Sequence, residues 1–453
     1  MAELRRDLGI WGAAAIVVGT VIGSGIFLVP KTMIQSVGSV EWVFLVWVAA
    51  GLLSLAGALT YGELAAAMPE AGGEYVYLRE AYGPFFGFVY GWTQMWVAKS
   101  GSIAALATGF FYYLANFHPN LEQVFFTIGI PIGPNGGPIE VRYGQLAAIG
   151  VILFLGGLNY FGVKVGGGVQ VVVTVIMVAS IFAIVWAGLT SSAGNSANFS
   201  SNVPATAGVA GFFAAMVAAL WAYDGWNNVT MVASEIREPQ RNLPLALTAG
   251  VAGIIVIYLA ANLAYFYILP ATEVASSDRV AATMMGKLMG EWGAGAVSVA
   301  AMISMFAAIN GSILSGSRVP YAMARDGLFF KRLSHVNEHY RTPAASILAL
   351  SGWSAVLVLS GRYDDLFNFV IFSSWILYAM AAASVIVLRR KRPNMERPYR
   401  TVGYPAVPVL FVLVAIGLLA NTMIERPRES FLGLGLILTG VPFYFRWKKR
   451  ISN

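Results

Sequence analysis

Long apolar runs recur along this chain. Seven of them lie at residues 42–62, 143–163, 242–272, 292–317, 342–361, 366–388 and 401–424. A helix needs about 20 mainly apolar residues to cross a bilayer, so each run predicts one transmembrane helix. The charge-free stretch 165–223 predicts two more, because the polar segment 191–195 divides it.

Two further apolar segments contain glycine where a spanning helix should be continuous. The first covers residues 8–30 and is interrupted by Gly23-Ser24-Gly25; the second starts near Pro204 and is interrupted at residues 221–225. Irregular backbone at membrane depth is tolerated only where it is buried in protein or lines a cavity. Matched breaks in two halves of a hydrophobic chain are typical of secondary transporters.

With the region around Lys99 and a last span at 430–445, we predict twelve transmembrane helices in an all-α membrane protein. The expected starts lie near Leu8, Glu41, Gly83, Tyr143, Gly166, Pro204, Asn242, Glu291, Thr342, Asp365, Tyr404 and Ser430. The third, from Pro84 to Phe117, is long for one vertical span. Since no loop signal interrupts it, we expect one tilted helix.

Composition agrees with a membrane protein. The 453 residues are 58% hydrophobic and 11% charged, with a mean hydropathy of +0.69. About three times as many basic residues fall on the side of both termini as on the other side, which predicts cytoplasmic termini in a multi-pass protein of the plasma membrane. The outer set is Lys31, Arg142, Arg279, Lys287, Arg362, Arg426 and Arg428.

The same features exclude several other classes. The net charge of +7 follows from this topology, so no nucleic-acid partner is expected. Without cysteine, the chain cannot carry a disulfide-linked ancillary subunit or a thiolate metal site. His335, Glu338 and His339 match an H-x-x-E-H zinc pattern, but the short basic connection around them leaves no room for a catalytic domain. We therefore predict no enzyme, no metal and no cofactor.

The two breaks indicate where a substrate binds. A broken helix exposes free N–H groups at one half and free carbonyls at the other, and a zwitterion needs both. In the first segment the N–H groups of Ser24 and Gly25 suit a carboxylate, and the carbonyls near Val21 and Ile22 suit an ammonium. Around the second break, the backbone from Trp221 through Ala222 to Asp224 offers further carbonyls. An alternative is that these glycines only allow close helix packing.

Several strings carry a resemblance to a known family. Residues 18–27 (VGTVIGSGIF), 63–74 (ELAAAMPEAGGE) and 159–164 (NYFGVK) resemble amino acid transporters of the amino acid-polyamine-organocation superfamily. Residues 221–227 (WAYDGWN), 234–244 (SEIREPQRNLP) and 310–318 (NGSILSGSR) are similar to its L-type group and bacterial homologues. The resemblance covers nearly the whole chain.

It implies one transporter domain over residues 1–453 with the LeuT-type fold. That fold has two inverted five-helix repeats, here at about 8–190 and 204–390, and two extra helices at about 404–448. Its first and sixth helices are unwound. Gly23-Ser24-Gly25 then resembles the carboxylate cradle, and Trp221 the aromatic residue that covers the substrate from outside. Lys164 resembles a lysine whose ammonium replaces a coupling ion, and Tyr258 a tyrosine that buttresses the same region.

Two charged residues leave alternatives open. An acid at Asp224 could favour cationic substrates, but a short acidic side chain at a helix break is more often a cap for the following helix, which we favour. Lys99 lies at mid-membrane, where a cation is costly unless it is solvated or paired. It either reaches the pocket and repels cationic substrates or bridges carbonyls at a helix bend.

We expect a monomeric, sodium-independent exchanger of neutral L-amino acids, of small ones such as alanine, serine or threonine. The alternatives are a proton- or sodium-coupled symporter and an exchanger of cationic amino acids. A channel would need more polar residues inside the spans. A nutrient sensor with the same fold is a further alternative, although no signalling domain is appended.

Overall fold

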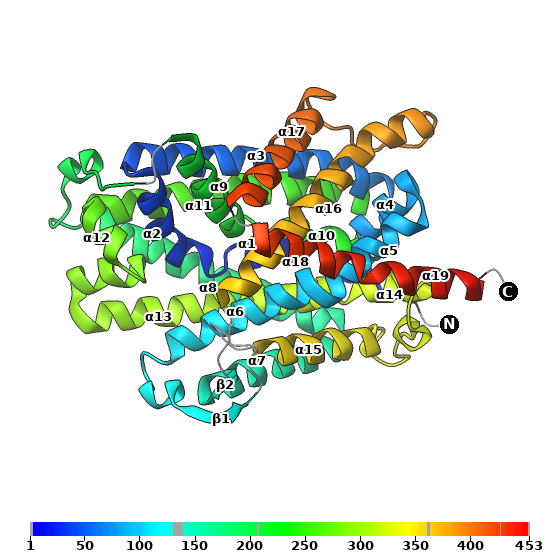
Figure 1. Cartoon of the computed structure of the whole chain (residues 1–453), viewed down its shortest axis with the longest axis horizontal. Helices are drawn as coiled ribbons and strands as arrows, with labels where there is room; N and C mark the ends of the chain where they lie inside the picture. The colour runs from blue at the N-terminus through cyan, green and yellow to red at the C-terminus, as the bar shows by residue number, and fades with distance from the viewer. Residues whose placement is uncertain (1–2, 130–138, 206–207, 360–362, 426, 452–453) are drawn as a thin grey trace.

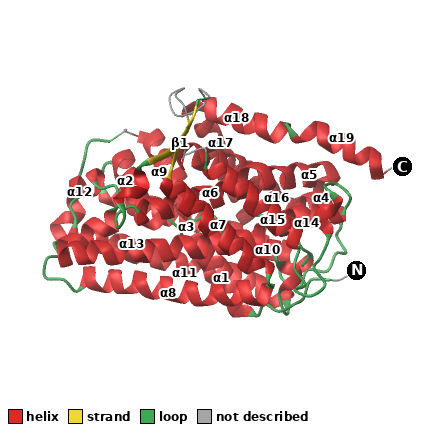
Figure 2. Ribbon diagram, turned by 90° about the horizontal axis from the view of Figure 1, so that it is seen from below, coloured by secondary structure: helices red, strands yellow, loops and turns green. Residues whose placement is uncertain are grey.

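The computed structural model describes residues 3–129, 139–205, 208–359, 363–425 and 427–451. Helices run along the long axis of an elongated bundle, and both termini lie at the same end (Figures 1 and 2). The first half contains α1 (Ile10–Val21), α2 (Gly25–Val37), α3 (Val40–Ala67), α4 (Glu74–Tyr82), α5 (Pro84–Thr93), η1 (Gln94–Ala98), α6 (Lys99–Leu114), η2 (Pro119–Glu122), β1 (Val124–Ile128), β2 (Ile139–Arg142), α7 (Tyr143–Tyr160) and α8 (Val163–Leu189).

In the described residues of the second half, every regular element is a helix. Its elements are η4 (Ser196–Ser200), α9 (Gly208–Ala222), α10 (Asn228–Met231), η5 (Ala233–Glu235), α11 (Pro239–Ile268), α12 (Ala271–Ser276), α13 (Val280–Gly316), α14 (Arg318–Arg325), η6 (Lys331–Ser334), α15 (Ala344–Val358), α16 (Tyr363–Lys391), α17 (Ala406–Glu425), α18 (Pro427–Leu438) and α19 (Gly440–Ile451). The short strands β1 and β2 pair antiparallel.

Each of the twelve expected spans corresponds to helical residues. Among the described residues, six helices are long and apolar enough to cross a membrane, and the bent pair α1–α2 makes a seventh. The apolar helices α9 and α15 are shorter than that criterion requires. The count of twelve spans therefore stays a prediction. Two of the basic residues assigned to the outer side, Arg362 and Arg426, lie outside the described residues.

The third expected helix is continuous from Pro84 to Leu114, as its lack of loop signals predicted. Its middle, η1, is a π-helical turn, which accommodates one extra residue in the helix. The last expected span differs from the prediction, because Thr439 divides it into α18 and α19. Pro442 has no N–H to donate to the carbonyl four residues earlier, so the helix is weakest there.

A buried ion pair joins the second broken segment to α14. The Arg318 guanidinium donates to both oxygens of Glu235 in η5, at 2.7 Å from Nε and 2.9 Å from Nη2, and both side chains are 0% exposed. Glu235 also lies against the start of the chain, since its carbonyl accepts from the Leu8 N–H at 3.0 Å. This pair therefore connects three segments far apart in sequence.

Candidate functional site

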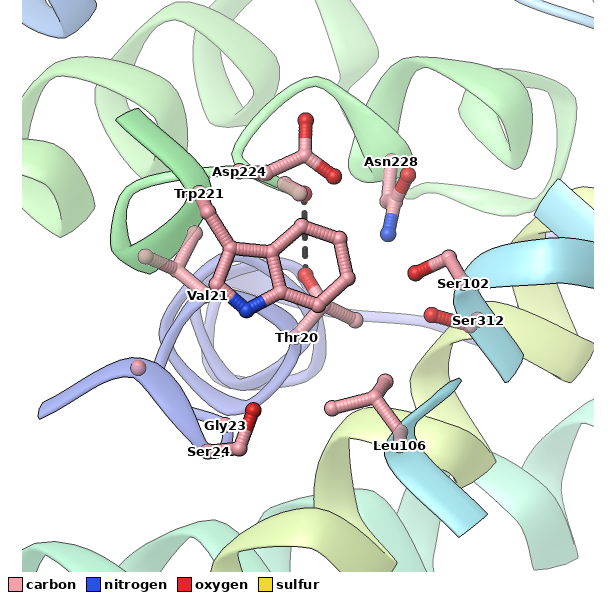
Figure 3. Close-up of a pocket in the computed structure, with 12 residues that line it drawn as sticks. Thr20, Val21, Gly23, Ser24, Ser102, Leu106, Trp221, Asp224, Asn228 and Ser312 are labelled. Atoms are coloured by element: carbon pink, nitrogen blue, oxygen red, sulfur yellow. Dashed lines mark hydrogen bonds between the residues drawn. The ribbon is translucent and has the colours of Figure 1, made fainter. Parts of the chain in front are cut away.

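The two interrupted segments meet in the middle of the bundle. Helix α1 ends at Val21 and α2 begins at Gly25, with a bend of 41° between them. Helix α9 ends at Ala222 and α10 begins at Asn228. The Thr20 hydroxyl lies 2.9 Å from the Gly225 carbonyl oxygen of the second break and 2.6 Å from the Ile16 carbonyl oxygen of its own helix, so it can donate its single proton to either (Figure 3).

Two glycines make this close approach possible. A Cβ at Gly25 would lie 2.6 Å from the Cα of Ala222, so α2 and α9 could not remain at their present distance. Gly225 has φ +106°, which side chains rarely adopt, and a Cβ there would lie 3.0 Å from the Thr20 carbonyl oxygen. Gly25 is thus required by the close contact with α9, and Gly225 by its positive φ.

Side-chain hydroxyls engage the carbonyls of the breaks. The Tyr258 hydroxyl of α11 lies 3.1 Å from the Val21 carbonyl oxygen and 2.6 Å from that of Ala222. Ser304 of α13 donates to the Ile22 carbonyl at 2.8 Å, with the Gly23 carbonyl 3.3 Å away. The structure thus places Tyr258 at the breaks, as the resemblance implies, and adds Ser304, which sequence reasoning missed.

A small cavity lies where the breaks meet. Its polar lining consists of Thr20, Ser24, Ser102, Asp224, Asn228 and Ser312, and Figure 3 shows these side chains around a common centre. The cavity volume is about 20 Å³, which is enough for little more than one water molecule. The indole of Trp221 lies across the site in front of Thr20 and is only 6% exposed. A ligand larger than a water molecule therefore enters only after side chains such as Trp221 move.

Most of the expected substrate-binding residues gather here. Val21, Gly23, Ser24, Gly25, Trp221 and Asp224 line the cavity, whereas Ile22 and Ala222 contact Ser304 and Tyr258 instead. Sequence reasoning missed Ser102, Asn228 and Ser312. A hydroxyl or an amide within an apolar run is the one signal that could have indicated them, but many such residues along the chain only bond their own helix.

Asp224 does not cap the following helix, so the favoured interpretation of this residue is wrong. The N-cap of α10 is Asn227, and no side chain bonds the free N–H groups there. Instead, the Tyr378 hydroxyl of α16 donates to Oδ1 of Asp224 at 2.9 Å. The cap fails because Asp224 comes four residues before α10, too far to reach its first turn. Its carboxylate faces the cavity.

Lys99 lies behind the cavity rather than in its lining. Its ammonium donates to Oδ1 of Asn228 at 2.6 Å and interacts electrostatically with Asp224 and Glu74. This hydrogen bond goes to a side-chain oxygen, whereas a lysine that bridges a helix bend would bond the helix carbonyls. Lys99 therefore orients Asn228 at the wall of the site and offsets the charge of Asp224.

Glu74 supports the second break from its other side. Its carboxylate accepts hydrogen bonds from the amide of Asn227 and from the Tyr90 hydroxyl, the latter at 2.9 Å, and its side chain is fully buried. The Asn227 amide thus donates to the Glu74 carboxylate, and the Asn228 amide accepts from the Lys99 ammonium. These two bonds constrain the backbone between α9 and α10.

Lys164 does not reach the first break. Its side chain is exposed at the start of α8. The α8 residues that contact α1 are Gln170 and Thr174, both of which donate to the Ala15 carbonyl, at 3.2 and 3.3 Å. Gln170 lies about 9 Å further along the helix and on a different face, because six residues turn an α-helix by roughly 240° beyond one full turn. The α8 side chains that contact α1 are therefore neutral and meet it inside the helix, at Ala15, rather than at the break.

The Gln170 amide also belongs to a polar group between helices. Asn310 of α13 donates to Oε1 of Gln170 at 2.8 Å, and Asn159 of α7 donates to Asn310 at 2.8 Å. All three side chains are fully buried. The sequence signal that could have indicated Gln170 is its polar amide side chain within the charge-free stretch 165–223.

The zinc pattern is not formed. His335, Glu338 and His339 lie in non-helical turns after η6, so the helix that would present them to one ion does not exist. Among the described residues no group of three or more His, Asp or Glu side chains is arranged to hold a metal.

Nearly the whole chain is similar to known proteins. The sequence profile described as "Amino acid permease" matches residues 8–441. The serine/threonine exchanger SteT of Bacillus subtilis is 33% identical, covering 99% of this chain and 98% of that protein. The human b(0,+)-type amino acid transporter 1 is 32% identical, covering 100% and 91%, and the human cystine/glutamate transporter is 29% identical, covering 99% and 87%.

Proposed function

Because this chain belongs to the amino acid permease family, whose relatives above are amino acid transporters in membranes, we propose that it exchanges small neutral L-amino acids across the plasma membrane without sodium. The observation that carries the proposal is the junction of the two breaks. Residues at the start of α2 and residues of the second broken segment line one cavity, and this supports a site that binds both ends of a zwitterion.

The lining supports small neutral substrates such as alanine, serine or threonine. Its polar side chains are short, and hydroxyls of Ser102 and Ser312 suit a small polar side chain. Asp224, the acid of the lining, accepts from Tyr378 and lies within electrostatic range of Lys99, which disfavours a cationic substrate. The name of the bacterial serine/threonine exchanger points to the same substrate class.

Sodium independence rests on the carbonyls of the breaks. In sodium-coupled transporters unwound carbonyls coordinate the ion. Here protein donors already engage those of Val21, Ile22 and Ala222, through Tyr258 and Ser304. We propose that these neutral hydroxyl donors occupy the position of a coupling ion, which the resemblance had assigned to the Lys164 ammonium.

Alternating access completes the proposal. The repeats at about 8–190 and 204–390 would rock around the junction, and Trp221 would close the outer side. Both termini would be cytoplasmic. A single chain suffices because every group of the junction comes from one protomer.

Counter-flow in proteoliposomes tests this function. Uptake of labelled serine should require internal serine, alanine or threonine and should be unchanged when choline replaces sodium. Leucine and arginine inside the vesicles should support it poorly. A matched preparation of empty liposomes gives the background. Uptake that needs sodium or a proton gradient, or that proceeds equally into vesicles without amino acid, would overturn the proposal of exchange.

Masking the carboxylate of the substrate should weaken binding strongly. Serine methyl ester keeps the ammonium but loses the charge that the N–H groups at Ser24 and Gly25 complement. A hydrogen bond to a charged group contributes about 1.5–3 kcal/mol, so the inhibition constant against serine uptake should rise roughly ten- to a hundredfold. Homoserine, which keeps both charged groups, is the control. If the ester and serine inhibit equally, the cradle is not at α2.

A further inference from the structure

A large cavity lies away from the transport site, at the end of the bundle where both termini lie. Its volume is about 1270 Å³, and it opens between α14, η6 and α19. Four cations line it, Arg325, Lys331, Arg332 and Arg446, with the carboxylate of Glu3 at the edge. Nothing in the transport mechanism uses this cavity.

Its cations are available to a ligand. All four side chains are exposed, and none forms an ion pair with another described residue. The guanidinium of Arg325 lies 5.9 Å from the ring centre of Tyr321 and interacts with the hydroxyl of that residue. Four cations against one carboxylate give the cavity a net positive charge, which suits an anion.

The floor of the same cavity is aromatic. Phe329 and Trp447 pack together with 5.5 Å between ring centres, and Phe330 packs edge-on against Trp447 at 5.2 Å. Phe330 and Phe443 remain 52% and 42% exposed, so large apolar surfaces face the open space. A small hydrated anion gains nothing from such surfaces, whereas a hydrocarbon chain does.

We propose that this cavity binds an anionic phospholipid, with the phosphodiester against Arg325, Lys331, Arg332 and Arg446 and the upper acyl chain on Phe330, Phe443 and Trp447. Basic pockets between transmembrane helices on the cytoplasmic side suit such headgroups. The volume exceeds that of a free phosphate many times over. With the termini cytoplasmic, as proposed above, the lipid belongs to the inner leaflet.

Helix α19 makes the site part of the membrane boundary. Its residues Tyr444 and Trp447 are buried against the bundle, while Arg446 and Lys449 are exposed. Tyr444 packs on Phe85 with 5.2 Å between ring centres, which anchors α19 beside α5. A lipid in the cavity would bridge α19 to η6 and add a contact that stabilises the folded protein.

Thermal unfolding of the whole chain in detergent tests the proposal. Phosphatidylglycerol, titrated at constant detergent, should raise the melting temperature, whereas phosphatidylcholine with the same acyl chains and inorganic phosphate should not. Lys331→Gln with Arg446→Gln should weaken the apparent lipid affinity by roughly 25-fold, since each cation near an anionic headgroup contributes about fivefold. Raising the salt concentration should weaken it further, because exposed charges are screened.

The control removes the same charge elsewhere. Arg390→Gln with Lys449→Gln changes two exposed cations outside the cavity and should leave the lipid response unchanged. Should the cavity pair not fold, Arg332→Gln is compared with Arg390→Gln, and a loss of about fivefold is expected. The proposal would be overturned if cavity and control variants lost the same affinity, or if phosphatidylglycerol had no effect. It would also be overturned if phosphatidylcholine or phosphate alone raised the melting temperature equally.

Discussion

Arg318→Met should lower the free energy of unfolding by about 3–5 kcal/mol, because it leaves the Glu235 carboxylate buried without its partner. Both side chains are 0% exposed and meet through two hydrogen bonds, so no water can replace the guanidinium without opening the structure. Chemical or thermal unfolding followed by tryptophan fluorescence measures the change. Transport should fall as well, since Glu235 follows the second break closely.

Arg241→Met is the matched control. Arg241 pairs with Glu238 at 3.8 Å, with both side chains more than 70% exposed, so its loss should cost at most about 1 kcal/mol. Adding Glu235→Gln to Arg318→Met should restore part of the lost stability, because it removes the buried charge. Equal destabilisation by Arg318→Met and Arg241→Met, or no recovery in the double variant, would show that the buried pair does not hold these segments together.

Gly25→Ala should abolish exchange while the protein still folds. The new Cβ would lie 2.6 Å from both Cα and Cβ of Ala222, a backbone contact that only a shift of α2 or α9 relieves. Overpacking of this kind costs typically 1–3 kcal/mol, and here it separates the two breaks that form the site. Counter-flow of labelled serine and binding by isothermal calorimetry are the measurements.

Gly168→Ala makes the same chemical change at a place with free space. A Cβ at Gly168, on the exposed side of α8, meets nothing within 4 Å, so exchange should stay normal. Alanine is also the better helix former, so the substitution should not lower stability. Normal exchange in Gly25→Ala would mean that the close approach of α2 to α9 is not needed for transport.

The breaks could be predicted from sequence because their signal is local. Apolar runs of spanning length indicate the helices, and glycine within such a run indicates where a helix ends. The residues between Val21 and Gly25, and those between Ala222 and Asn228, are indeed non-helical. The relation of one break to the other is not local, and it was predicted from the general behaviour of matched breaks and from the family resemblance.

The surroundings of the breaks could not be predicted in the same way. Lys164 seemed suited to the first break, yet the residue that faces α1 is Gln170, because the rotation of α8 depends on packing with α1 and α13. The π-helical turn η1 adds one residue to the third helix, which changes the face on which every later side chain lies, Lys99 and Ser102 included. No pattern of apolar residues indicates such an insertion.

The Tyr258 hydroxyl has a single proton for two neighbouring carbonyl oxygens. It lies within hydrogen-bonding distance of two carbonyls, Val21 in the first broken segment and Ala222 in the second, but a phenol carries one proton. At any instant it donates to one of them. Under the proposed function, a substrate ammonium that donated to Val21 would leave the phenol to donate to Ala222 alone. Occupancy of one half of the protein would then change the bonding of the other half through a single hydrogen atom, before any helix had moved.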